Sequence, residues 1–259
     1  MKAANFDYVR VSTIEEACQA LKDGGEDARI IAGGQTLVPL MAMRLARPTL
    51  LIDINDVEEL VGIRIDDGHL VVKARTRQAD TLTSEVVKKE LPLLAEGLSH
   101  VGHTQTRNRG TVGGSLVNAD PSAEIPLIAQ TIEATIIVES TRGRRAIEAC
   151  DFFESAMATT LMPDECLIEV CFPINCVENT GFGFHEVSIR DSDYALAAAA
   201  AQTTLDGSGN CKKLDVGICG ASPAPLRLAA LEEMLIGKKL DDETVEEACS
   251  TIDDLIDPQ

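Results

Sequence analysis

The sequence has 259 residues, enough for two compact domains, and its hydrophobic and charged fractions of 45% and 25% are ordinary for a soluble globular protein. The formal net charge of −19 argues against nucleic acid and anionic membranes as partners, because both would repel such a surface. The longest apolar run follows Tyr194 and is too short to span a bilayer, and the N-terminus lacks the apolar core of a signal peptide. A cytoplasmic location is therefore expected.

The first 57 residues have the pattern of an α/β unit. Short strands are predicted at residues 8–11, 29–31 and 50–53, with helices after residue 13 and over about 37–45. Ser12 and Glu15 have the spacing of a capping box that would start the first helix. The order strand, glycine turn, helix, strand predicts a right-handed connection. This first lobe is expected to end near Val57.

A second lobe is predicted over residues 58–174. Strands at 62–66 and 69–74 are joined by a glycine turn and lead into a mostly helical stretch, 78–101, in which Pro92 marks a break or a first turn. Residues 104–124 are polar and rich in glycine and asparagine, so they are expected to form a long loop. Strands are expected again at 135–138 and up to Cys150. Residues 164–172 alternate like a half-buried strand that ends at Pro173.

From about Asn175 the composition changes, which predicts a separate small domain over residues 175–259. Strands are expected at 181–190 and 213–219. The alanine-rich stretch 194–205 has high helix propensity, but the hairpin turn at 206–210 favours a strand there. Two helices, at about 226–235 and 242–255, are expected to close the chain.

The eight cysteines predict neither a metal centre nor a disulfide framework. Cys166, Cys171 and Cys176 are evenly spaced, but their odd spacing puts the first two on opposite faces of a strand. Plant-type iron–sulfur ligation needs a tighter run. His100 and His103 have no carboxylate or nucleophile at a recognisable spacing, so both are expected to be structural. No metal ligand and no catalytic acid or base is therefore predicted in this chain.

Two glycine-rich segments carry the functional prediction. The first is Ala32-Gly33-Gly34-Gln35-Thr36, between a predicted strand and a predicted helix, where backbone N–H groups favour an anion such as pyrophosphate. By itself this pattern is also that of an ordinary turn, and the third glycine of the dinucleotide fingerprint is missing.

The second segment, residues 107–124, interleaves glycines, hydroxyls, amides and charges over a length that is uncommon for a loop without a function. Its backbone donors could form a nest for phosphates, while Asn118, Asp120 and Glu124 could hold a sugar hydroxyl or a ring nitrogen. Two such segments in separate lobes predict a long, bent ligand held from both sides.

Residues 32–40 and 107–124 resemble the two flavin-binding motifs of the FAD-binding medium subunit of the molybdenum hydroxylase family, which includes carbon monoxide dehydrogenase and xanthine dehydrogenase. The resemblance covers nearly the whole chain, with both motifs in the same order and spacing. It implies an α+β fold. A two-lobed FAD-binding domain of the vanillyl-alcohol-oxidase (PCMH) type would occupy residues 1–174, with lobes 1–57 and 58–174. A small α+β domain like that of the CO dehydrogenase flavoprotein would occupy 175–259. It is apparently short, because relatives usually continue in a helical tail beyond the position of Asp257.

The resemblance also implies which residues contact FAD. The residues implied around the pyrophosphate are Ala32, Gly33, Gly34, Gln35, Thr36 and Leu37 in the first segment and Thr111, Val112, Gly113, Gly114 and Ser115 in the second. Gly102, Thr106 and Gly110 would lie along the cofactor, with Asp120 and Glu124 at its polar groups. Leu167 would lie near the ring, and Tyr194, at the end of the segment 190–194, would approach the isoalloxazine. His185 takes a position that is often lysine in xanthine-type members.

The implied function is electron transfer through one non-covalently bound FAD. Electrons would come from two [2Fe-2S] clusters of a small subunit, which receives them from a molybdopterin cofactor in a large subunit, and would leave to an external acceptor. The implied assembly is (LMS)2, two copies of each of the three subunits. Two alternatives stay open: a stand-alone flavin-dependent oxidase of the vanillyl-alcohol-oxidase type, and a regulatory nucleotide-binding module. The second is disfavoured because neither glycine segment contains Gly-Lys-Ser or Gly-Lys-Thr.

Overall fold

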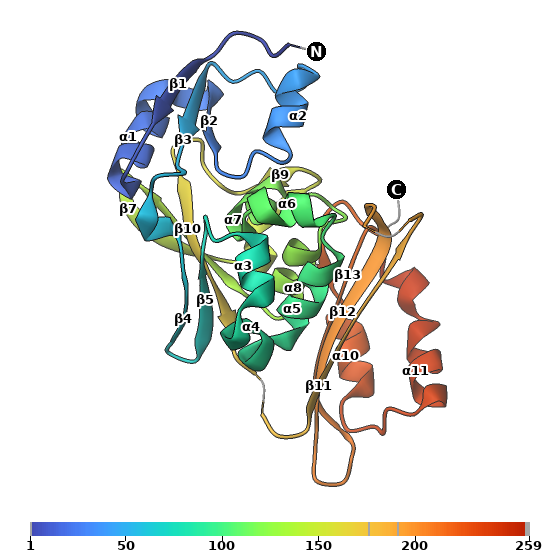
Figure 1. Ribbon diagram of the computed structural model, residues 1–259. Helices are drawn as coiled ribbons and strands as arrows, with labels where there is room; N and C mark the ends of the chain where they lie inside the picture. Colours follow the sequence, from blue (N-terminus) through green and yellow to red (C-terminus); the bar gives the residue numbers. More distant parts are fainter. Residues whose placement is uncertain (1, 176, 191, 257–259) are drawn as a thin grey trace.

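The computed structural model describes residues 2–175, 177–190 and 192–256 (Figure 1). Cys176, Asp191 and Asp257 lie outside the described residues. The strands are β1 (Asp7–Arg10), β2 (Ala28–Ile31), β3 (Leu50–Asp53), β4 (Ile63–Asp66), β5 (His69–Lys73), β6 (Thr135–Ser140), β7 (Gly143–Glu148), β8 (Phe153–Ser155), β9 (Ala158–Thr159), β10 (Cys166–Pro173), β11 (Thr180–Ser188), β12 (Ala195–Leu205), β13 (Cys211–Cys219) and β14 (Leu226–Arg227). The helices are α1 (Ile14–Gly24), α2 (Leu37–Ala42), α3 (Gln78–Thr83), α4 (Glu85–Glu90), α5 (Pro92–His100), α6 (Thr104–Arg109), α7 (Val112–Asn118), α8 (Glu124–Thr131), α9 (Ala149–Phe152), α10 (Ala229–Leu235) and α11 (Asp242–Cys249), with short 3-10 turns at Gly25–Asp27, Glu58–Leu60 and Ile252–Asp254.

The first lobe is a small parallel sheet in the order β1-β3-β2, as the α/β pattern predicted. The buried face of α1 packs against it through residues at helical spacing, Ile14, Ala17, Cys18 and Leu21. The predicted capping box is wrong by one residue. The helix begins at Ile14, so Thr13 is the N-cap, and its hydroxyl accepts from the N–H of Glu16 at 3.1 Å.

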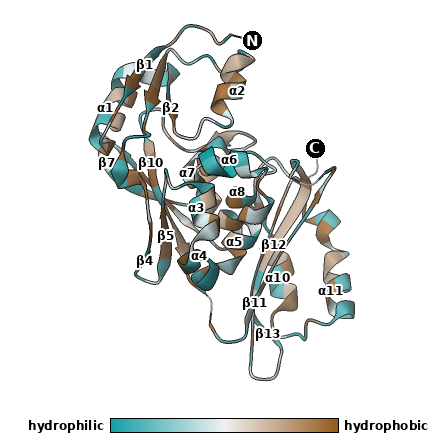
Figure 2. Cartoon of the chain, in the orientation of Figure 1, coloured by the Kyte–Doolittle hydropathy of each residue, from teal (hydrophilic) through white to brown (hydrophobic). Residues whose placement is uncertain are grey.

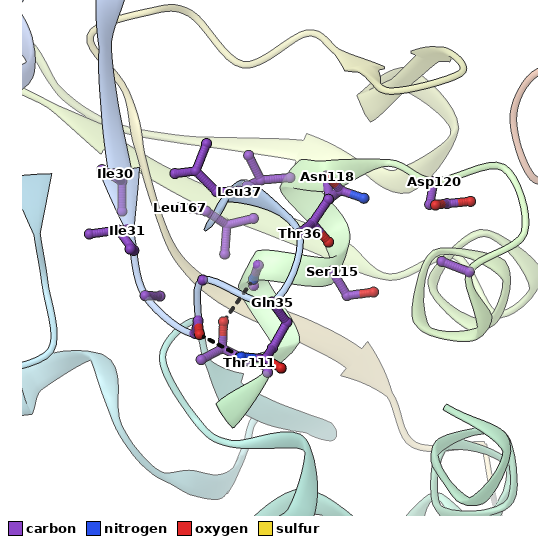
Figure 3. A pocket seen from close by; sticks show the side chains of 18 of the residues that line it. Ile30, Ile31, Gln35, Thr36, Leu37, Thr111, Ser115, Asn118, Asp120 and Leu167 are labelled. Atoms are coloured by element: carbon purple, nitrogen blue, oxygen red, sulfur yellow. Dashed lines mark hydrogen bonds between the residues drawn. The ribbon is translucent and has the colours of Figure 1, made fainter. Parts of the chain in front are cut away.

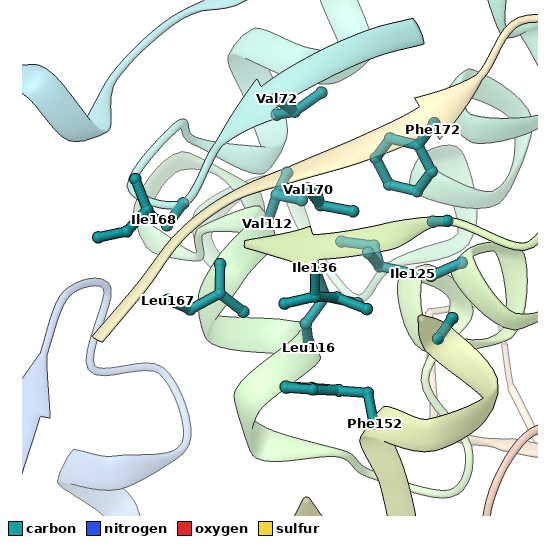
Figure 4. Close-up of a cluster of buried hydrophobic side chains, with 14 of the residues drawn as sticks. Val72, Val112, Leu116, Ile125, Ile136, Phe152, Leu167, Ile168, Val170 and Phe172 are labelled. Atoms are coloured by element: carbon teal, nitrogen blue, oxygen red, sulfur yellow. The ribbon is translucent and has the colours of Figure 1, made fainter. Parts of the chain in front are cut away.

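The second lobe is built on an antiparallel sheet in the order β4-β5-β10-β6-β7. The central strand β10 was predicted as half-buried, but nearly all of its side chains are buried. The reason is that α7 packs on it from one side and α1 from the other. In Figure 4, Val112 of α7 lies beside Val170 of this strand, and Leu116 of α7 belongs to the same buried cluster. Glu169 is tolerated there because Arg64 and Lys73 pair with its carboxylate at 3.0 and 2.7 Å.

Three helices, α3 to α5, follow β5 in the chain, and Pro92 is the first residue of α5, as predicted. The long loop expected over residues 104–124 is wrong, because α6 and α7 occupy most of it. The Thr111 hydroxyl caps α7 by accepting from the N–H of Gly114 at 3.1 Å. Packing on neighbouring backbone outweighs the low helix propensity of the glycines in this segment.

The C-terminal sheet is antiparallel, in the order β11-β12-β13-β14, with α8 packed on one face and α10 on the other (Figure 1). The alanine-rich stretch is strand β12, as the hairpin turn predicted. The helix predicted over 226–235 is wrong in its first part, because Leu226 and Arg227 pair with β13 as strand β14. The last predicted helix ends early, at Cys249, where the Thr251 hydroxyl donates to the carbonyl of Ala248 at 2.8 Å. Helix α2 also ends early, before Arg44 with its left-handed φ of 61°.

Hydrophobic residues concentrate where the two parts of the molecule meet. Helix α8 lies between α5 and the C-terminal sheet, and almost all of its side chains are buried. In Figure 2 it is largely hydrophobic, whereas α6, at the surface, is hydrophilic. No helix in the described ranges is both long and apolar enough to cross a membrane.

Candidate cofactor site

A cavity of about 720 Å³ lies between the first lobe and the second. One wall is β2 and the segment that follows it, and the opposite wall is α7 with the residues before and after it (Figure 3). The loop before β10 and residues 192–194 complete the lining. The two glycine segments, far apart in the sequence, therefore face one space.

Most of the residues implied by the family resemblance line this cavity. These are Ala32, Gly33, Gly34, Gln35, Thr36, Leu37, Gly102, Thr106, Gly110, Thr111, Gly113, Gly114, Ser115, Asp120, Glu124, Leu167 and Tyr194. Val112 and His185 do not. Val112 points into the hydrophobic core and is fully buried (Figure 4), and its N–H donates to the carbonyl of Thr76. His185 is exposed on β11, away from the cavity.

The first glycine segment presents free backbone donors to the cavity. Within the described residues, no N–H group of residues 33–37 has a hydrogen-bond acceptor. Gly34 has a φ of 69°, in the left-handed region that favours glycine. A Cβ atom on Gly33 would lie 2.3 Å from the carbonyl oxygen of Arg109, so only glycine fits where the two lobes touch. Successive unpaired donors in such a turn form a nest that suits an anion.

The second segment was expected to offer backbone donors to a phosphate, but most of its N–H groups are already paired. The N–H groups of Val112, Gly113 and Ser115 already donate to the carbonyls of Thr76, Ala74 and Thr111. They are not available to a phosphate in this conformation. Gly113 instead permits close packing, since a Cβ there would lie 2.8 Å from Ala74. The second segment thus gives the cavity a tight backbone wall and side-chain hydroxyls, and the free donors belong to the first.

Glu124 is the most perturbed acid of the cavity. It is 9% exposed, and burial raises its pKa to about 7, with further contributions from the charges of Glu186 and Asp120. A carboxyl group of this kind exchanges its proton close to neutral pH. Within the described ranges, no group of three or more histidine, cysteine or acidic residues is placed to hold a metal ion.

Tyr194 lines the cavity with a side chain that is 72% exposed, so it borders both the cavity and solvent. The loop before it is held by Arg190, whose guanidinium donates to the carboxylate of Asp193 at 2.9 and 3.0 Å. The Arg190 side chain keeps the pKa of Asp193 below its usual value. Asp193 is therefore an anion at neutral pH.

Sequence reasoning missed several residues of the lining. Ile30 and Ile31 reach it from β2, and Met157 and Met162 reach it from the loop around β9. Gln78 also lines it, with a buried side-chain oxygen that has no partner among the described residues. No sequence signal marks Gln78, because it begins an ordinary helical pattern and only the tertiary structure brings it to Gly110.

Two family models match the chain. Residues 4–175 match the FAD binding domain in molybdopterin dehydrogenase, and residues 182–259 match the CO dehydrogenase flavoprotein C-terminal domain. The chain belongs to this family. It is 38% identical to the 6-hydroxypseudooxynicotine dehydrogenase complex subunit alpha of Paenarthrobacter nicotinovorans, over 100% of this chain and 87% of that relative. It is 32% identical to the carbon monoxide dehydrogenase medium chain of Afipia carboxidovorans, over 100% of this chain and 89% of that relative.

Solved structures of carbon monoxide dehydrogenase and of a related oxidoreductase have the same fold as this chain. Carbon monoxide dehydrogenase from Hydrogenophaga pseudoflava superimposes with a TM-score of 0.96 at 32% identity, covering 100% of this chain and 90% of that one. Quinoline 2-oxidoreductase from Pseudomonas putida 86 gives 0.95 at 36% identity, covering 100% and 89%. The family resemblance and the α+β fold expected from the sequence are confirmed, and the chain is an FAD-binding oxidoreductase subunit.

Proposed function

We propose that this chain binds one FAD in the cavity between its lobes and passes electrons from the [2Fe-2S] clusters of a small subunit to an external acceptor. The single observation that carries the proposal is the run of unpaired N–H groups at residues 33–37, which faces a cavity of about 720 Å³. Ligand pockets of small molecules and cofactors are typically about 300–1,000 Å³. The membership of the FAD-binding family supports the choice of ligand.

Residues 33–37 are proposed to hold the pyrophosphate. Their free donors would replace water around a charged group at little reorganisation, and a nest of this kind favours negative charge. The tight contact between Gly33 and Arg109 keeps side chains out of this place. Ser115 and Thr111, on the facing segment, add hydroxyl groups. When bound, the flavin supplies the redox chemistry, and the protein supplies placement and electrostatics.

The part of the cavity lined by Leu167 and Tyr194 is proposed to receive the flavin ring. Leu167 offers an apolar surface from β10, and Tyr194 offers an aromatic ring at the solvent boundary. Glu124 can accept or donate a proton near neutral pH because burial raises its pKa to about 7. Proton exchange at a nearby acid is useful to a redox group that changes its charge.

The assembly is also a proposal. Relatives of this chain are named as medium chains or as subunits of dehydrogenases. On that basis the proposed partners are a large subunit with molybdopterin and a small subunit with two [2Fe-2S] clusters. The proposed stoichiometry is (LMS)2, two copies of each subunit. The proposed domains are 1–174, with lobes 1–57 and 58–174, and 175–259. The family matches at 4–175 and 182–259 support this division. A cytoplasmic location stays a prediction. A stand-alone oxidase is not favoured, since the match to these dehydrogenase subunits covers the whole chain.

Titration of the purified full chain with FAD, followed by quenching of flavin fluorescence, tests the proposal. Saturable binding is expected, with riboflavin much weaker because it lacks the pyrophosphate that residues 33–37 would hold. Equal binding of FAD and riboflavin would contradict the assignment of the pyrophosphate to these donors. Absence of any FAD binding, by the chain alone and by its complex, would contradict the proposal as a whole.

A further inference from the structure

The two glycine segments belong to different lobes, so something must fix the distance between them. The second segment is attached by its backbone to residues 74–78. Gly113 donates to the carbonyl of Ala74 at 2.9 Å, and the N–H of Gln78 donates to the carbonyl of Gly110 at 3.0 Å. Residues 74–78 therefore form the base on which the second segment is mounted.

The side chain of Arg77, in the middle of this base, reaches the first lobe. One terminal nitrogen donates to the carbonyl of Arg109, and the other donates to the side-chain oxygen of Asn55 at 2.8 Å. The Asn55 amide nitrogen in turn donates to the carbonyl of Ala32 at 2.8 Å, directly before Gly33. A continuous chain of hydrogen bonds thus runs from one glycine segment to the other.

Both ends of this chain of hydrogen bonds lie where the two lobes are in contact. The Arg109 carbonyl that accepts from Arg77 is the same group that a Cβ on Gly33 would meet at 2.3 Å. Asn55 is itself held by Asp53, which accepts from its backbone N–H at 2.9 Å and from its side chain at 2.6 Å. The planar guanidinium can bond both acceptors at once, which an ammonium group on a flexible stem does poorly.

The charge of Arg77 does not explain its place. No carboxylate in the described part of the chain lies within ion-pair distance of its guanidinium. Burial, together with the charges of Arg75 and Arg109, lowers the pKa of Arg77. A cation kept in such surroundings is retained for its hydrogen bonds rather than for an ion pair.

We propose that Arg77 is a positioning residue that acts through Asn55, spanning the two lobes and fixing the separation of the glycine segments at which FAD is bound. The inference rests on the proposed FAD function. Arg77 does not line the cavity, so its effect on the ligand would be indirect.

The test compares Arg77→Lys with Arg144→Lys in the full chain. Arg144 is a surface residue paired with Glu139, so its replacement is a matched control. Arg77→Lys keeps the charge and loses the two-pronged bond. We expect its dissociation constant for FAD to rise about 10- to 100-fold, which is about 1.4 to 2.8 kcal/mol of binding free energy. The melting temperature of the ligand-free chain should stay close to that of the control.

The variant Asn55→Ala breaks the same chain of bonds at its second link. Its effect on FAD affinity and that of Arg77→Lys should be non-additive in the double variant, because either change alone breaks the connection. Unchanged FAD affinity in Arg77→Lys, or additive effects in the double variant, would overturn the inference. A loss of affinity that only follows a loss of thermal stability would also overturn it.

Hydrogen exchange of the ligand-free chain gives a readout that does not depend on FAD. The N–H of Val38 donates to the carbonyl of Gly34, and that of Gly110 donates to the carbonyl of Thr106. In Arg77→Lys both should exchange faster, while peptides of the C-terminal sheet should not change. If the unaltered chain bound no FAD, the proposed function would fail, and this exchange would still decide whether Arg77 couples the segments.

Discussion

Gly33 lies where the first lobe contacts the second, and the atoms it meets there belong to the backbone rather than to movable side chains. The carbonyl carbon of Arg109 and the Cα of Gly110 would lie 2.9 and 3.0 Å from a Cβ at this position. Glycine is therefore required at position 33 by the neighbouring backbone of the second lobe, and not only by the turn. Gly-Gly between a strand and a helix indicated the turn, but nothing in the sequence identified the partner carbonyl.

Replacement of Gly33 by alanine tests this. Because the contact atoms are backbone, the lobes must shift, and we expect Gly33→Ala to destabilise the fold by about 1–3 kcal/mol. FAD binding should be lost or strongly weakened. Gly207→Ala, in an exposed turn where a Cβ meets nothing within 4 Å, is the control. Urea unfolding and FAD titration would compare the stability and the FAD affinity of the two variants. Equal stability and equal affinity would contradict the tight contact at Gly33.

Glu124 predicts a pH dependence. Its folded pKa of about 7 lies above the ordinary value of 4.5, so the folded state holds the proton more tightly than the unfolded chain does. Its contribution to stability is full below the unfolded pKa and is lost as the pH rises through the folded pKa. Glu124→Gln is neutral at every pH. As the pH rises from about 4.5 to 7, the free energy of unfolding of the variant should therefore increase relative to that of the unaltered chain, by on the order of 3 kcal/mol.

Chemical denaturation of both proteins from about pH 4 to 8.5 would measure this difference. The difference in unfolding free energy should grow with pH and then level off. Parallel stability curves would mean that Glu124 is not buried as the structure has it.

At the scale of elements, periodicity and turns predicted most strands, and packing decided the rest. The hairpin turn after residue 205 correctly made β12 a strand despite its alanines. In contrast, α7 contains Gly113 and Gly114, and it forms because Thr111 caps it and Ala74 lies against it. Strand β14 has only two residues, and it pairs with β13 next to the Arg227 ion pairs. Such contacts join residues that are far apart in the sequence, so no local sequence pattern predicts them.

Arg227 is the ionic link between these elements. It pairs with Asp215 of β13 at 2.8 Å, with Glu232 of α10 at 2.9 Å and with Glu133, after α8, at 2.6 Å. The hydrogen bonds to Glu232, and after it to Glu133, raise the pKa of Arg227. Asp215 and Glu232 are buried, so removing the cation leaves buried carboxylates without their main partner.

We expect Arg227→Leu to destabilise the chain by about 3–5 kcal/mol, the range for breaking a buried ion pair on one side. Arg144→Leu, which breaks an exposed pair with Glu139, should change stability by about 0–1 kcal/mol. Thermal or urea unfolding would compare them. A similar loss of unfolding free energy in the two variants would show that the ion pairs of Arg227 contribute little to stability.

At the scale of the whole molecule, the cavity is made by the meeting of two lobes, and neither lobe contains it alone. The family resemblance, read from residues 32–40 and 107–124, predicted that two segments would grip one ligand. The sequence could not show which segment has free donors, because that depends on acceptors in residues 74–76. A ligand that bridges the lobes should stabilise them together.

Bound FAD is therefore expected to raise the melting temperature of the chain, since a ligand at 100 times its dissociation constant stabilises the native state by about 2.7 kcal/mol. The shift should increase with FAD concentration. Riboflavin at the same concentration should give a smaller shift. No shift with FAD at saturating concentration would argue against a ligand between the lobes.

The most direct test of the central claim is the absorbance spectrum of the purified chain, with the cofactor released on denaturation identified by mass. Flavin bands and release of FAD are expected, at about one FAD per chain when the site is filled. A colourless protein that takes up no added FAD, either alone or with its co-purified subunits, would contradict FAD binding by this chain.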